Sequence, residues 1–156
     1  MFVNVTPVAT GEAWVGYGVR SFRSVISELI TSANAELIMT VYLLTSREIV
    51  NEIKGALSRG VLVTVYLYDD EKKITKTGAV GNIYKLQKEY PYLNICRIKN
   101  KVLHAKILVA DCKKVLVGSA NFTQPAMVNN YEMGFLIEDT AVAGQVIDLI
   151  QKMGAE

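Results

Sequence analysis

Apolar and polar positions along the chain follow two alternating periods, one typical of helices and the other of strands. In residues 20–33 apolar side chains recur at helical spacing, and residues 36–43 form a short apolar run typical of a buried strand. A second helix follows, which Thr45 and Glu48 begin as a capping box and Gly60 ends. The pattern therefore predicts an α/β chain in which strands and helices alternate.

The rest of the chain is predicted to hold a polar loop, two more helices and a group of strands. We expect the loop at 69–82, where glycine and charged residues replace apolar ones, and then a helix that ends near Tyr90, before Pro91. The other predicted elements are an edge strand over 2–8, strands over 61–68, 93–98, 102–110, 114–118 and 131–138, and a helix from a Thr140 cap to about 153. This order predicts a mixed, mostly parallel β-sheet sandwiched between helices, in a single domain over 1–156.

Composition narrows the class of protein but not its partners. With 51% hydrophobic and 21% charged residues, the 156-residue chain has the composition of an ordinary folded domain, and its net charge of +2 neither demands nor excludes nucleic acid. No apolar run reaches the roughly 18 residues that span a bilayer, so we expect a cytoplasmic protein without stable membrane insertion. Cys96 and Cys112 have no histidine nearby, so we expect buried thiols and no metal site.

One segment, HAKILVADCKKVLVGSAN, combines a strand-like run with ionisable and polar side chains. It starts at His104, the only histidine of the chain, and Lys106 is two residues on, so both would share one face of a strand. Asp111, at an odd offset, would point to the other face or lie past the end of the strand. Ser119 and Asn121 follow the next strand, in a turn that a hairpin would return towards His104. Ammonium, hydroxyl and amide groups together suit a phosphate oxyanion.

Glu132 lies in an otherwise apolar predicted strand, where a carboxylate needs a partner. It could accept a hydrogen bond from the Nδ1–H of His104, which would fix the tautomer and leave Nε2 free. Each residue also has an ordinary structural interpretation. A single histidine on an apolar strand is usually a core residue, Lys106 could lay its stem along the surface, and Glu132 could face water. Only their joint spacing favours a site.

This spacing resembles the HKD signature of the phospholipase D superfamily. Every position of the signature is filled in His104-x-Lys106-x4-Asp111-x6-Gly118-Ser119-x-Asn121. A glutamate eleven residues after the asparagine, here Glu132, also matches the family. The order of elements from about residue 12 onward resembles the minimal domain of the family, and the single-motif form looks most like its small dimeric nucleases.

The resemblance implies a metal-independent phosphodiesterase that needs no cofactor. In this family one histidine attacks phosphorus and forms a phosphohistidine, and a second histidine protonates the leaving oxygen. Because this chain has one histidine, the resemblance implies a homodimer whose two-fold axis passes through the active site. The implied roles are nucleophile or acid for His104, phosphate binding for Lys106 and Asn121, hydrogen bonding beside the phosphate for Ser119, orientation of His104 for Glu132, and a catalytic part of unassigned kind for Asp111.

Two groups of basic residues favour nucleic acid, DNA or RNA, as the substrate. One precedes His104 and the other lies in the 69–82 loop, so both could flank a phosphate groove. Their members are Arg97, Lys99 and Lys101 in the first group and Lys72, Lys73 and Lys76 in the second. Both groups could also be solvated surface, and the acidic residues of the same loop weaken a simple basic track.

Two other functions remain open. A phospholipase D or phosphatidyltransferase would act on lipid head groups, although the sequence offers no amphipathic helix with a basic face that would favour a membrane surface. A nucleic-acid-binding module without catalysis would bind the same phosphates, although such a module could lose His104 freely.

Overall fold

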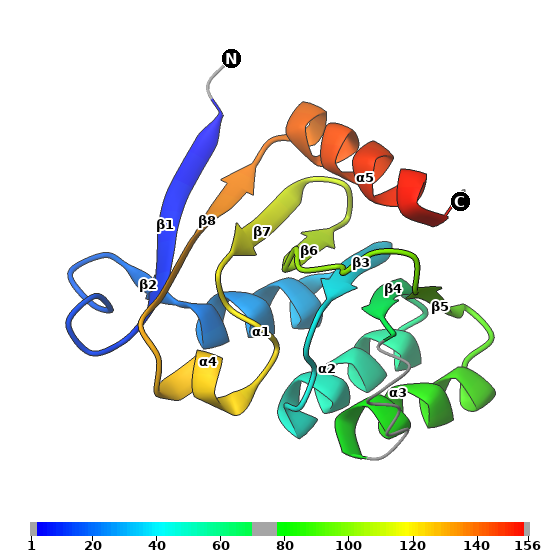
Figure 1. The fold of residues 1–156 in the computed structure, drawn as a ribbon. Helices are drawn as coiled ribbons and strands as arrows, with labels where there is room; N and C mark the ends of the chain where they lie inside the picture. Colours follow the sequence, from blue (N-terminus) through cyan, green and yellow to red (C-terminus); the bar gives the residue numbers. More distant parts are fainter. Residues whose placement is uncertain (1–2, 70–77, 155–156) are drawn as a thin grey trace.

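The computed structural model describes residues 3–69 and 78–154, which form thirteen elements (Figure 1). The strands are β1 (Asn4–Thr10), β2 (Arg20–Ser21), β3 (Glu36–Val41), β4 (Leu62–Tyr68), β5 (Leu93–Ile98), β6 (Ile107–Ala110), β7 (Lys114–Gly118) and β8 (Glu132–Glu138). The helices are α1 (Phe22–Ser32), α2 (Arg47–Ser58), α3 (Gly78–Glu89), α4 (Gln124–Val128) and α5 (Thr140–Gly154).

All the described strands join one eight-stranded sheet in the order β2-β1-β8-β7-β6-β3-β4-β5. The predicted α/β fold with a mixed sheet is confirmed. Parallel pairing does not dominate, however: three of the seven neighbouring pairs are parallel and four are antiparallel. The short turn between β6 and β7 permits only antiparallel pairing, because parallel strands need a long crossover. The N-terminal strand β1 was predicted at an edge, but it lies between β2 and β8.

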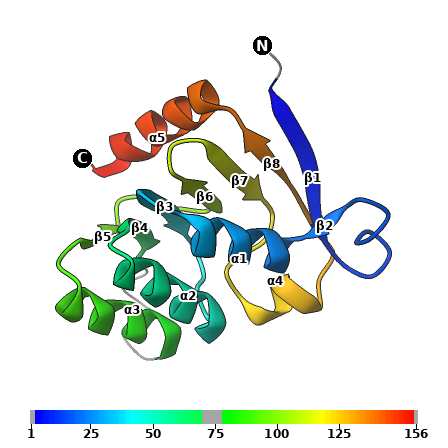
Figure 2. The ribbon, with the colours of Figure 1, turned by 180° about the vertical axis from the view of Figure 1, so that it is seen from behind.

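Helices cover both faces of the sheet, as predicted (Figures 1 and 2). The larger apolar core lies between the sheet and helices α1, α2 and α3, and the smaller one lies beneath α5. Strand β3 contributes to both cores, because Leu37 and Met39 belong to the larger core and Ile38 to the smaller. The central strand is therefore buried on both faces.

Helix N-termini depart from the prediction by one residue. Ser46, not Thr45, caps α2, since the Ser46 hydroxyl accepts the backbone N–H of Ile49. Asp139, not Thr140, caps α5 in the same way. Neighbouring Ser, Thr and Asp side chains are all capable caps, so only the local backbone decides which of them reaches the free N–H groups.

The polar loop and the two cysteines also differ from expectation. Helix α3 begins at Gly78, so the end of the predicted 69–82 loop is helical, and residues 70–77 lie outside the described part. Cys96 is half-buried, but Cys112 is exposed. Cys112 sits in the β6–β7 turn with a φ of 52°, at a position that points out of the sheet rather than into a core.

A pair of facing glycines lets β7 and β8 approach closely. Gly118 and Gly134 are register partners, and a Cβ on Gly134 would lie 2.4 Å from the carbonyl oxygen of Val117 and 2.8 Å from the Phe22 ring. No side chain larger than hydrogen fits this position without movement of the backbone. The pair lies directly beside Ser119, so the close approach sets how two of the candidate site segments meet.

Replacement of Gly134 by alanine should therefore destabilise the fold. We expect Gly134→Ala to lower the free energy of unfolding by about 1–3 kcal/mol, because backbone atoms must move to admit the methyl group. Gly144→Ala is the matched control, since a Cβ there meets nothing within 4 Å, and it should stabilise α5 by about 1 kcal/mol. Urea unfolding of both variants measures the difference, and equal stabilities would contradict the close approach of β7 and β8.

Candidate active site

The residues of the predicted site gather at one end of the antiparallel strands. His104 and Lys106 precede β6, Ser119 follows β7, and Glu132 begins β8. Because neighbouring antiparallel strands run in opposite directions, the start of β6, the end of β7 and the start of β8 lie at the same edge of the sheet. Asn121 lies two residues beyond Ser119. The structure thus collects all five at this edge.

The strand predicted over 102–110 is shorter than expected, since β6 begins at Ile107. The hydroxyl of Thr40 accounts for the difference: it donates to the carbonyl oxygen of Ala105 and accepts the N–H of Ile107, each at 2.9 Å. Thr40 is fully buried in β3. A side chain thereby replaces the ladder bonds on both sides of Lys106 and holds that backbone in place.

Lys106 contacts His104 directly. Its Nζ lies 3.1 Å from Nδ1 and 3.3 Å from Nε2 of the imidazole. One ammonium this close to both ring nitrogens cannot lie along both of their in-plane directions, so the contact fixes no tautomer. Burial lowers the pKa of Lys106, and the negative charge of Glu132 opposes that effect in part.

Glu132 has partners other than the histidine. Its Oε1 accepts the hydroxyl of Ser119 at 2.6 Å, and its Oε2 accepts the amide of Asn130 at 3.1 Å. The hydrogen bond from His104 to Glu132 that the sequence suggested is not formed between these described side chains. The single hydroxyl proton of Ser119 is also engaged, so in this arrangement Ser119 holds Glu132 and the N–H of Met133 rather than a ligand.

Two residues that contact the site, Asn130 and Tyr42, were not predicted from the sequence. Asn130 is two residues before Glu132, a spacing that places both side chains on one side of an extended chain and could have revealed the contact. Tyr42 follows β3 directly, and its ring centroid lies 4.8 Å from that of His104 at an interplanar angle of 57°. No local motif connects Tyr42 with His104, because 62 positions separate them in the chain.

Asn121 is half-buried, and its side-chain oxygen is shielded from solvent. This oxygen accepts no hydrogen bond from the described residues. A buried amide oxygen without a donor costs free energy and is unusual in folded proteins. A phosphodiester offers only acceptors, so a bound phosphate would meet the NH2 group of Asn121 and not this oxygen.

Asp111 is not brought to the other candidates. It follows β6 whereas Lys106 precedes it, so about 16 Å of extended chain separates the two. Its carboxylate accepts the backbone N–H groups of Asn34, Ala35 and Glu36. Burial alone would raise the pKa of Asp111, but the three N–H groups outweigh it and the pKa is lowered. The catalytic part expected of Asp111 therefore has no support in the geometry, which ties the end of β6 to the start of β3.

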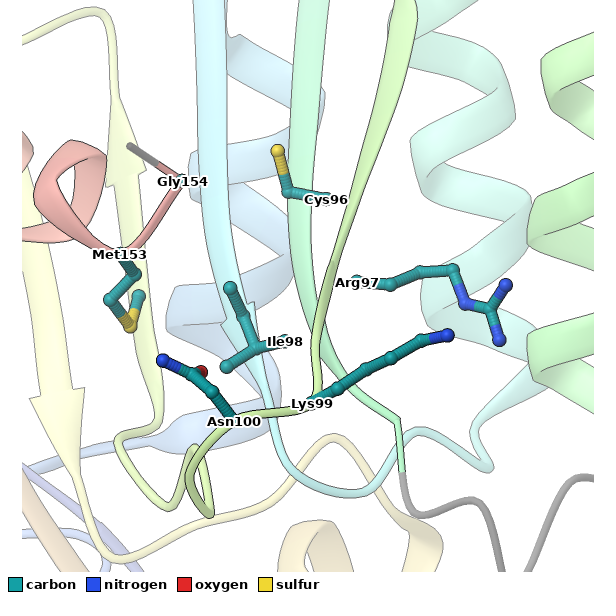
Figure 3. Close-up of a pocket in the computed structure, with 7 residues that line it drawn as sticks. All are labelled: Cys96, Arg97, Ile98, Lys99, Asn100, Met153 and Gly154. Atoms are coloured by element: carbon teal, nitrogen blue, oxygen red, sulfur yellow. The ribbon is translucent and has the colours of Figure 1, made fainter. Parts of the chain in front are cut away.

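The first basic group is only partly available to a ligand. Arg97 forms an ion pair with Asp69, and Lys99 approaches the same carboxylate at 3.9 Å. Figure 3 shows both basic side chains extending together, away from Met153. They line an open hollow of about 270 Å³ between β5 and the end of α5, which shares no lining residue with the predicted catalytic set. Lys101 is exposed.

The second basic group cannot be placed, since Lys72, Lys73 and Lys76 all lie outside the described residues. In the described ranges, 3–69 and 78–154, no helix has the length and apolar character needed to cross a bilayer. Over the same ranges, no three His, Cys, Asp or Glu side chains gather where they could hold a metal ion.

Comparison with known families agrees with the signature and the fold. The family model described as "Cardiolipin synthase, PLD-like domain" matches residues 26–153, most of the chain. The chain belongs to the phospholipase D superfamily. The predicted family is thereby confirmed from a match that extends far beyond the signature residues.

Among curated relatives, the phospholipase D of Rickettsia conorii is 29% identical over 118 residues, which are 76% of this chain and 56% of the relative. The chain thus spans about half the length of the curated phospholipases D it matches. Two solved structures match nearly end to end. Nuc from Salmonella typhimurium, a phospholipase D family member, has a TM-score of 0.80 at 22% identity, with 97% of this chain and 94% of Nuc covered. NucT from Helicobacter pylori has a TM-score of 0.78 at 26% identity, with 97% and 96% covered.

The Thr40 hydroxyl should contribute strongly to the stability of the fold, because it has two backbone hydrogen-bond partners. We expect Thr40→Val, which keeps the shape, to lower the free energy of unfolding by about 2–4 kcal/mol, because a carbonyl and an N–H lose their partner. Thr40→Ser keeps the hydroxyl and should lose only about 1 kcal/mol. Urea unfolding gives the stabilities, and amide hydrogen exchange of Ile107 reports the bond itself. Unchanged exchange in Thr40→Val would contradict this account.

Asp111 should contribute to the stability of the fold and not to the chemistry at the edge of the sheet where His104 lies. We expect Asp111→Asn to lower the free energy of unfolding at pH 7 by about 1–2 kcal/mol, since one acceptor and the charge are lost. The folded pKa is lowered, so the contribution is present above the unfolded pKa of about 3.9 and disappears as the pH falls through the folded value. Urea unfolding from pH 7 to pH 2 should show the two proteins converging in acid, and a constant difference would contradict the role.

Proposed function

We propose that this protein is a phosphodiesterase that cleaves nucleic acid through a phosphohistidine, in a homodimer that shares one active site. The observation that carries the proposal is the edge of the sheet where His104 meets Lys106, with Ser119, Asn121 and Glu132 beside them, in a chain with no second histidine. A superfamily chemistry that needs two imidazoles then requires a second copy of this edge.

In the proposed reaction a ring nitrogen of His104 attacks phosphorus, and a P–N bond forms as the bond to the leaving oxygen breaks. The imidazolium of the second subunit gives its proton to that oxygen. Water then attacks phosphorus, the second imidazole takes a proton from the water, and the P–N bond breaks. The products are a phosphomonoester and an alcohol, and both imidazoles return to their starting states.

Lys106 suits the charge that develops on phosphorus oxygens. Its ammonium lies beside the imidazole, so a phosphate in reach of the attacking nitrogen is also in reach of a cation. Asn121 supplies an amide at the same edge. The negative charge of Glu132 would repel a phosphate, but hydrogen bonds from Ser119 and Asn130 partly spread it.

The short single-motif form and the dimer are supported by different observations. The chain aligns over nearly the full length of Nuc and NucT, whereas it covers about half of the Rickettsia phospholipase D. Strand β8, which Glu132 begins, also carries apolar side chains that are exposed in the single chain, Met133 and Phe135 at 48% and 46%. Methionine and aromatic residues of this kind are enriched in protein interfaces.

A lipid phosphodiester is the second candidate substrate. The description of the matching family model and the names of the curated relatives favour it, since they refer to cardiolipin synthase and phospholipase D. The short single-motif form favours nucleic acid instead. The substrate experiment must therefore include both classes.

The proposed function predicts cleavage that depends on His104 and persists in excess EDTA. Labelled single- and double-stranded DNA and RNA, and vesicles of phosphatidylcholine and phosphatidylglycerol, are incubated with wild type and with His104→Asn. We expect nucleic-acid cleavage by the wild type and at least a 10³-fold loss in the variant, because the nucleophile is removed (about this size for loss of covalent catalysis). Turnover of the vesicles alone would replace the nuclease by a lipase, and turnover of neither would overturn the proposed activity.

Mixed dimers test the shared site. Wild type and His104→Asn are unfolded together and refolded at varied ratios, so that subunits assort at random. If one site needs two imidazoles, activity should fall with the square of the wild-type fraction, to about one quarter at equal amounts. A linear fall, to about one half, would show that each chain works alone.

A further inference from the structure

We propose that Tyr42 is a positioning residue that holds the imidazole of His104 in its reactive orientation. The inference rests on the proposed function for the consequence in catalysis, but the contact itself can be tested without any substrate. The ring of Tyr42 lies 4.8 Å from that of His104, centroid to centroid, at 57°. This is the tilted geometry that favours attraction between two rings.

His104 needs such a contact, because little else in the described chain holds its ring. The side chain is exposed, and His104 lies in a segment without regular secondary structure before β6. Its polar contact is the ammonium of Lys106, which fixes no tautomer and has a flexible stem. The carboxylate of Glu132, the orienting group that the sequence suggested, is occupied by Ser119 and Asn130.

Tyr42 is itself well anchored. It follows directly on β3, which is buried on both faces, and its ring stacks on that of Tyr68 at 5.6 Å and 21°. Tyr68 ends the neighbouring parallel strand β4, so two adjacent strand ends form one aromatic support. Thr40 and Tyr42 are two residues apart: Thr40 holds the backbone at Ala105, and Tyr42 holds the ring of His104.

An aromatic ring also suits a phosphate site better than a carboxylate in the same place. The Lys106 ammonium lies 5.7 Å from the centroid of Tyr42, within the reach of a cation–π contact. One neutral ring thus contacts both groups that the phosphate would meet. Orientation of His104 is obtained without a second negative charge that would repel the substrate.

The expected effect of losing the ring falls on the chemical step. Attack on phosphorus requires the ring nitrogen in line with the leaving oxygen, and small errors of orientation are costly. Tyr42→Leu should therefore reduce kcat by about 10- to 100-fold and change KM by less than about 3-fold. Tyr42→Phe should retain activity within about 3-fold, because the contacts of Tyr42 with Tyr68, His104 and Lys106 are all made by its ring.

Tyr92→Leu is the matched control. It removes a tyrosine from another tyrosine pair, with Tyr90 at 6.1 Å between ring centroids, at the end of α3 and the start of β5. We expect unchanged kcat and KM per folded molecule. Tyr68→Leu is a second test, since it removes the support of Tyr42 without touching His104, and should lower kcat by less than Tyr42→Leu does.

Nuclear magnetic resonance tests the contact directly, because the chain has a single histidine and so a single pair of imidazole C–H signals. We expect cross-relaxation between the rings of Tyr42 and His104, and ring-current shifts of the imidazole signals that disappear in Tyr42→Leu and persist in Tyr42→Phe. If Tyr42→Leu does not fold, Tyr68→Leu and Tyr42→Phe carry the comparison.

The two failures are distinguishable. Absent cross-relaxation, or a folded Tyr42→Leu with kcat within 2-fold of wild type, would overturn the positioning role. If the wild type cleaves no phosphodiester, the proposed function fails. The contact between the rings of Tyr42 and His104 is then still tested by the resonance measurement.

Discussion

The candidate site depends on two hydrogen bonds made by one buried hydroxyl. Thr40 lies in the central strand, where a backbone ladder would normally continue, and its side chain takes over the carbonyl of Ala105 and the N–H of Ile107. The chain before Ile107 can therefore leave the sheet while these two backbone groups keep a partner. His104 and Lys106 stand in that released yet fixed segment, and so they reach solvent while the strand beside them remains in the core.

The other half of the site depends on close backbone approach. Gly118 and Gly134 face each other across β7 and β8, and neither position has room for a Cβ. Ser119 and Glu132 flank this pair and meet at 2.6 Å. The close approach of these two backbones thus places the Ser119 hydroxyl and the Glu132 carboxylate beside the segment that carries His104. Folding therefore orders both groups before any ligand binds.

Much of this could be predicted from the sequence. The periods of apolar residues gave the α/β class, and the spacing of His104, Lys106, Ser119 and Asn121 gave both the family and the edge of the sheet where they meet. The odd offset of Asp111 left two places open for it, the other face of the strand or past its end, and the structure has the second. What failed depends on contacts between distant segments. The late start of β6 depends on Thr40, and the partners of Glu132 depend on β7 and β8 lying side by side. The support of His104 depends on Tyr42, which follows β3. Local patterns do not encode such pairs.

The hydrogen bonds that the Asp111 carboxylate accepts give a structural reason for the four-residue spacing between Lys106 and Asp111 in the signature. Four residues separate Lys106 from Asp111, and these four are strand β6, Ile107–Ala110. At one end the strand is fastened to β3 by the Thr40 hydroxyl, and at the other by the Asp111 carboxylate. The number of residues between Lys106 and Asp111 therefore fixes the length of β6. An insertion or deletion among them would break the hydrogen bonds at one end of β6 and let its register shift. A shift of one residue turns every side chain of a strand to the opposite face. The aspartate of the signature would then serve to fix the length and register of β6, away from the reacting phosphate.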